Sequence, residues 1–154
     1  MANVGKNIGI GCGLMVVALI AGLMCLGNAV KEPTDIEITV DAPLEVSQGE
    51  RFTIVVRVYN ADKKARELVD LDVADEYLEG IVIESSDPPF SDALHLPVDN
   101  TLSYSFDIMV AAGEEEVITF HAYAAHAGDY FGDIDFCIDS GVSCLSYPVR
   151  TIVR

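Results

Sequence analysis

Two cysteines and four aspartates lie close together near the end of this sequence, and their side chains have chemistry to offer. Residues 132–148 read GDIDFCIDSGVSCLSYP, and Cys144 follows Cys137 by seven positions. Thiolates bind soft metals or exchange with disulfides, whereas carboxylates bind hard cations such as Ca²⁺. The alternatives are therefore a metal site, a redox pair and a structural disulfide. The acidic candidates are Asp129, Asp133, Asp135 and Asp139.

An antiparallel hairpin with Cys137 opposite Cys144 accounts for this stretch. Ser140-Gly141 then forms a two-residue turn, in which glycine supplies a positive φ. Cysteines that face each other across two strands can form a disulfide, which would contribute about 2.5 kcal/mol in the chain-entropy model. A disulfide in a small domain is typical of an oxidising compartment. The same register pairs apolar residues on the inner face, Ile134 with Tyr147 and Phe136 with Leu145, and leaves the cysteines on the outer face with Asp133, Asp135 and Asp139.

The competing chemistries fit the spacing less well. Redox motifs usually have two residues between the cysteines, near a helix N-terminus. A structural zinc site needs four protein ligands, mostly nitrogen or sulfur, and nothing in the sequence places His95, His121 or His126 near the hairpin. Calcium is the better metal candidate, with the four aspartates as weak candidate ligands, although three of them follow one strand face. We expect a solvated acidic surface there and no bound cofactor.

No catalytic motif accompanies these residues. The sequence has no glycine-rich phosphate loop, no HExxH and no GxSxG. The odd spacing of His121 and His126 sends them to opposite faces of a strand. We therefore predict that the protein is not an enzyme.

The sequence after residue 30 is strongly acidic. All 25 acidic residues lie there together with 8 basic residues, which gives a net charge of −17. Such a surface repels nucleic acid and anionic lipid headgroups. It favours solubility, cations or a basic partner, so we expect no nucleic acid among the partners.

An apolar segment, Ile8 to Leu26, precedes the acidic part. As a helix it would be about 28 Å long, close to the hydrocarbon thickness of a bilayer. Cleavage after Ala29 is an alternative, but the run is longer than the usual apolar region of a signal peptide. We predict an uncleaved anchor at 1–30, a linker at 31–34 and a domain at 35–154. The charge of Lys6 favours a cytoplasmic N-terminus, which makes this a single-pass cell-membrane protein with its C-terminal domain on the extracytoplasmic side.

Small residues recur along this segment at four-residue spacing. Such a stripe lets a second helix approach closely in the bilayer. The anchor therefore predicts a protein partner, either another chain or a second copy of this one, in addition to the lipid. The predicted helix-packing residues are Gly5, Gly9, Gly13, Ala18, Ala21, Gly22 and Cys25.

After the anchor, apolar residues alternate with polar ones, and turn residues separate the alternating runs. Seven or eight short strands with regular turns are typical of an antiparallel β-sandwich. We therefore predict an all-β, immunoglobulin-like sandwich after one transmembrane helix. The expected strands are 35–41, 51–60, 68–73, 80–84, 102–110, 117–125, 132–139 and 144–153.

Two segments, PLEVSQGERFTIVVRVYNA and AAGEEEVITFHAYAAHAGDY, resemble the cell-adhesion-related (CARDB) surface domains of bacteria and archaea. The resemblance covers most of residues 35–153. It implies an immunoglobulin-like fold, a role in presentation, spacing or adhesion, and no catalytic residues. The matching residues are Gly49, Glu50, Asn60, Gly113, Glu114, Gly128 and Tyr130.

These observations together predict an accessory or structural subunit of a larger membrane or cell-envelope assembly. A pilin-like filament subunit is one alternative, although no glutamate occurs early in the apolar run. A secreted or anchored adhesion module that binds a cation or a glycan is another.

Overall fold

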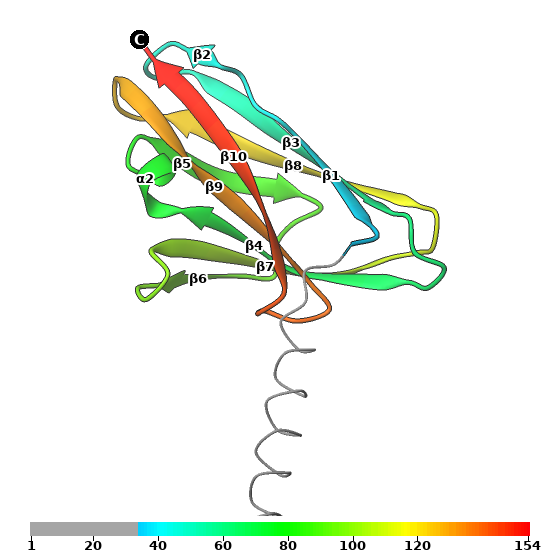
Figure 1. The fold of residues 1–154 in the computed structure, drawn as a ribbon. Coiled ribbons are helices and arrows are strands. Elements are labelled where there is room, and N and C mark those ends of the chain that lie inside the picture. The colour runs from blue at the N-terminus through cyan, green and yellow to red at the C-terminus, as the bar shows by residue number, and fades with distance from the viewer. Residues whose placement is uncertain (1–33) are drawn as a thin grey trace, which may run out of the picture. The chain divides into compact units, whose positions relative to one another are not determined.

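The computed structural model describes residues 34–154 (Figure 1). The predicted anchor and linker residues up to 33, including the helix-packing stripe, lie outside it. Within the described part no helix is long and apolar enough to cross a membrane. The elements are β1 (Ile36–Asp41), β2 (Glu45–Val46), β3 (Arg51–Asn60), β4 (Arg66–Ala74), α2 (Asp75–Leu78), β5 (Ile81–Asp87), β6 (Asp92–Leu96), β7 (Thr101–Val110), β8 (Glu115–Ala124), β9 (Gly128–Ile138) and β10 (Cys144–Val153).

These strands form two sheets, with the orders β1-β3-β8-β5 and β2-β10-β9-β4-β7-β6. The predicted all-β sandwich is therefore confirmed, and each of the eight expected strands is present. The described part has ten strands, two more than the eight expected, and the two that were not predicted are β2 and β6. β2 has two residues and pairs in parallel with β10, whereas the other strand pairs are antiparallel.

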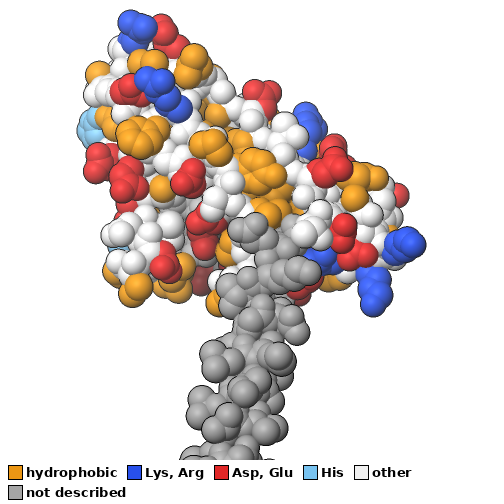
Figure 2. Space-filling view, in the orientation of Figure 1, with side chains coloured by type: hydrophobic (Ala, Val, Ile, Leu, Met, Phe, Trp, Pro, Cys, Tyr) orange, Lys and Arg blue, Asp and Glu red, His pale blue; other side chains and the backbone are white. Residues whose placement is uncertain are grey.

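The core lies between the two sheets and follows from the alternation in the sequence. Ile54, Val56 and Val58 of β3 are fully buried, and Phe120 of β8 and Phe136 of β9 face the same interior. Each buried side chain of this size stabilises the fold by about 1.5–3 kcal/mol relative to an exposed one. Figure 2 shows acidic side chains scattered over the viewed face of the sandwich domain, with apolar side chains exposed between them.

The asparagine of the CARDB-like pattern has a structural role. Asn60 is fully buried at the end of β3. Its Nδ2 donates to the carbonyl oxygens of Lys64 and Val110 at 2.8 and 2.9 Å, and its Oδ1 accepts from the Asp62 N–H at 2.9 Å. The amide thus joins the end of β3, the following loop and the end of β7.

The later Gly-x-Tyr of that pattern is also structural. A Cβ at Gly80 would lie 1.9 Å from the Tyr130 ring, and a Cβ at Gly128 would lie 2.7 Å from it. The ring therefore occupies space that only glycine leaves free at both positions. These two glycines let Tyr130 pack against the core beside β5.

Candidate functional site

The β9–β10 hairpin has the predicted register, with Cys137 opposite Cys144 and Phe136 opposite Leu145. The predicted disulfide is present, with a Cα–Cα distance of 4.0 Å. Its position in the fold agrees with the inference drawn from alternation and cysteine spacing. The hairpin is consequently held both by its backbone ladder and by a covalent bond.

The turn of the hairpin differs from the prediction. The Ile138 N–H donates to the Ser143 carbonyl at 3.0 Å, so the loop has four residues instead of two. The residue with positive φ is Asp139, at 59°, and Gly141 is not in that conformation. The reason is tertiary: Asp139 binds the edge of β4, accepting from the Glu67 N–H at 2.9 Å and from Arg66 Nε at 2.5 Å.

The outer face is less open at the cysteines than a solvated surface would be. Cys137 is fully buried, whereas Cys144 is half-buried. The cause is β4, which pairs with β9 so that Asp70 lies opposite Cys137 and Asp72 lies opposite Asp135. A carboxylate from a neighbouring strand therefore covers one sulfur of the disulfide.

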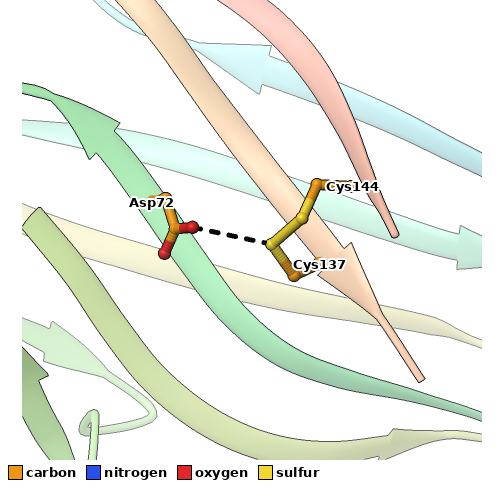
Figure 3. A group of neighbouring side chains, drawn as sticks. All are labelled: Asp72, Cys137 and Cys144. Carbon is orange, nitrogen blue, oxygen red and sulfur yellow. Dashed lines mark hydrogen bonds between the residues drawn. A yellow bond between two sulfur atoms is a disulfide. The ribbon is translucent and has the colours of Figure 1, made fainter. Parts of the chain in front are cut away.

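Figure 3 shows this contact between Asp72 and the disulfide. Asp72 Oδ2 lies 3.7 Å from Cys137 Sγ. A disulfide sulfur carries no hydrogen, so this is an anion in contact with a sulfur and not a hydrogen bond. The other carboxylate oxygen, Oδ1, is buried and has no hydrogen-bond partner in the described part.

The surroundings of Asp72 disfavour its charged form. Burial raises the pKa of the carboxyl above its usual range, and the negative charges of Asp70, Asp135 and Asp99 raise it further. The nearby Ser103 hydroxyl partly offsets these effects on the pKa, although no hydrogen bond of normal geometry reaches Oδ1.

The four aspartates proposed as calcium ligands are held by different partners. Arg150 binds Asp129 through two hydrogen bonds of 2.8 and 2.6 Å and lowers the pKa of that carboxyl. Asp139 binds Arg66, and Asp135 accepts a hydrogen bond from Ser146. Asp133 is exposed on β9. The structure thus spreads these four along β9 and its loop.

One group in the described part brings three metal-type ligand atoms within 4.8 Å of one another: Asp72, Cys137 and Cys144. Because both sulfurs are bonded to each other, neither is available as a thiolate ligand while the disulfide is intact. Asp72 could not be predicted as part of this group from the sequence. The alternation of apolar and polar residues in LVDLDV predicts an outward side chain for Asp72, but it does not tell which strand lies beside β4.

A shallow groove of about 670 Å³ lies over the other end of β9. Gly132, Pro148 and Phe131, which is 68% exposed, are among its lining residues. Glu76 and the Asp129–Arg150 ion pair also line it. The groove therefore combines an exposed aromatic ring with carboxylates.

The sequence matches no protein-family model and no curated protein. Among solved structures, the crystal structure of a CARDB domain from Pyrococcus furiosus, in complex with di-metal ions, is 16% identical, with a TM-score of 0.52 over 78% of this chain and 88% of that one. The solution structure of the same domain gives 15% identity, a TM-score of 0.50, and coverage of 80% and 97%. A Salmonella alpha-2-macroglobulin is 11% identical, with a TM-score of 0.53 over 79% of this chain and 7% of that one.

At these identities the likeness concerns the fold alone. It supports the CARDB-like, immunoglobulin-like sandwich expected from the sequence. The chain spans nearly the whole of the archaeal domain but a small share of the macroglobulin.

Proposed function

We propose that this protein is a non-enzymatic, single-pass membrane protein whose acidic sandwich stands on the extracytoplasmic side as an accessory or structural subunit of an envelope assembly. The observation that carries the proposal is the Cys137–Cys144 disulfide. Disulfides persist in oxidising compartments and are rare in the cytosol. The CARDB-like fold is compatible with a structural or adhesive module.

The apolar segment of the sequence supports the membrane part of the proposal. Ile8 to Leu26 is long enough to span the hydrocarbon core. Its small residues favour docking against a partner helix. Only a short linker is expected in the sequence, since five residues, Val30 to Thr34, precede the first expected strand.

The test is purification of the native protein from detergent-solubilised membranes, with its partners and its N-terminus read by mass spectrometry. We expect an intact N-terminus and partners at a fixed ratio. Gly9→Leu with Gly13→Leu should release the partner, whereas Met15→Leu, an apolar change on the other side of an ideal helix from Gly13, should not. A chain that starts at Val30, or one that co-purifies with nothing, contradicts the proposal.

A cation-binding adhesion module is the second candidate. It is favoured by the di-metal complex of the Pyrococcus furiosus domain and by the net charge of −17 carried by residues 31–154. Calcium should then raise the melting temperature of the protein, and EDTA should reverse the rise. An unchanged melting temperature removes this candidate and leaves the first untouched.

A further inference from the structure

The disulfide joins two strands, and a carboxylate on a third, neighbouring strand contacts one of its sulfurs. The strand order is β10-β9-β4, the disulfide joins β10 to β9, and Asp72 belongs to β4. Figure 3 shows Asp72 beside the disulfide, with a contact to the Cys137 sulfur, and a carboxylate oxygen of Asp72 lies within 4.8 Å of both sulfurs. The two cysteines differ in exposure to an attacking thiol, because Cys137 is fully buried and Cys144 is half-buried.

A thiolate attacks a disulfide sulfur along the line of the S–S bond, from the side opposite the sulfur that leaves. Cys137 is fully buried, so an external thiolate does not reach that side of its sulfur, and Asp72 Oδ2 lies beside the sulfur at 3.7 Å. The Asp72 carboxylate adds charge repulsion against an incoming thiolate. Attack on Cys137 is thus disfavoured twice.

Cys144 is the first residue of β10, where within residues 34–154 no strand pairs with the side of β10 away from β9. The other strand that pairs with β10 in the described part is β2, and it pairs at Ile152 and Val153, far along the strand from Cys144. Cys144 is also half-buried, in contrast to Cys137. An external thiolate therefore reaches this sulfur without displacing a strand.

Attack at Cys144 has its own cost, which again involves Asp72. The thiolate RS⁻ bonds to Cys144 Sγ, the S–S bond breaks, and its electron pair leaves on Cys137 as a thiolate. That thiolate forms beside the Asp72 carboxylate, and disulfides with poorer leaving groups exchange more slowly. At 3.7 Å in a partly buried site, the repulsion between two anions is weakly screened.

We propose that external thiols modify this protein at Cys144. Asp72 on β4 protects the disulfide, because it lies against the Cys137 sulfur and opposes the formation of the Cys137 thiolate. The acidic sandwich domain selects the class of thiol. Cationic thiols are attracted to the Cys144 side, neutral ones react more slowly, and anionic ones react slowest. This inference does not depend on the proposed function.

The test measures thiol exchange on the full-length chain in detergent. Cysteamine, 2-mercaptoethanol and 2-mercaptoethanesulfonate are compared at equal thiolate concentration, and samples are quenched at timed points with excess N-ethylmaleimide. We expect Asp72→Asn to accelerate exchange by about tenfold with each thiol. Asp133→Asn makes the same charge change on the outer face of β9 away from the sulfurs, and should change the rate by less than about twofold.

Mass spectrometry of the peptide that contains both cysteines locates the products. We expect the reagent thiol on Cys144 and the maleimide on Cys137. The reagent found mainly on Cys137 overturns the assignment of the attacked sulfur. Equal rates for Asp72→Asn and Asp133→Asn overturn the role of Asp72, and equal rates for the three thiols overturn the selection by charge.

Discussion

Replacing Asn60 with alanine tests whether this side chain holds the end of β3 to the following loop and to the end of β7. The change removes three hydrogen bonds, of 2.8, 2.9 and 2.9 Å, from a side chain with no exposed surface. Each bond contributes about 1 kcal/mol net, and partners left buried without a bond cost more. We expect Asn60→Ala to lower the free energy of unfolding by about 3–5 kcal/mol.

Such a loss is large against the usual stability of a domain, about 5–15 kcal/mol. Urea unfolding followed by tyrosine fluorescence is suitable, because the chain has six tyrosines and no tryptophan. With a typical m-value of about 2 kcal/mol/M, the midpoint should fall by roughly 2 M. Thr53→Ala, an exposed position on the same strand, serves as the control.

A second variant separates hydrogen bonding from packing. Asn60→Asp keeps the acceptor that binds the Asp62 N–H but loses both bonds donated by Nδ2, and it buries a charge. It should destabilise at least as much as alanine. A cost within about 1 kcal/mol of the wild type for both variants would refute the reasoning.

Three further outcomes follow from the hairpin and the core. Replacing Cys137 and Cys144 with alanine should lower the free energy of unfolding by about 2.5 kcal/mol, measured by urea unfolding; an unchanged value would mean that the strand ladder alone holds the hairpin. Because the pKa of Asp72 is raised in the folded state, ionisation destabilises the fold as pH rises above the ordinary value of 3.8. Asp72→Asn should therefore raise the melting temperature at pH 7, with the difference disappearing below that value. Gly80→Ala should cost about 1–3 kcal/mol, because its Cβ meets the Tyr130 ring, and adding Tyr130→Ala should make the alanine harmless.

The hairpin was predictable because its determinants are local. Cysteine spacing, alternation and turn residues within 17 positions all favour one register, and the structure has that register. The turn itself was not predictable, because Asp139 takes its conformation from contacts with Glu67 and Arg66, more than 70 positions away. Local signals specify which residues pair, whereas the loop adapts to its distant neighbour.

The two unpredicted strands lack the signal on which strand prediction depends. β6 is exposed along almost its whole length. Its sequence DALHL therefore lacks the alternation of buried apolar and exposed polar residues that identifies a strand. β2 has two residues and pairs with Ile152 and Val153 at the far end of the chain. Both are defined by tertiary contacts, and neither buries enough apolar surface to leave a periodic pattern.

Two measurements on Asp72→Asn, its stability and its rate of thiol exchange, together distinguish attack on the folded protein from attack after unfolding. Removing its charge should make the fold more stable, since the carboxylate is partly buried among Asp70 and Asp135. If the disulfide opened only when the domain unfolds, a more stable variant would be reduced more slowly. If Asp72 protects the disulfide in the folded protein, the same variant is reduced faster. A rise in melting temperature together with a rise in exchange rate therefore identifies attack on the native hairpin, which global unfolding does not imitate.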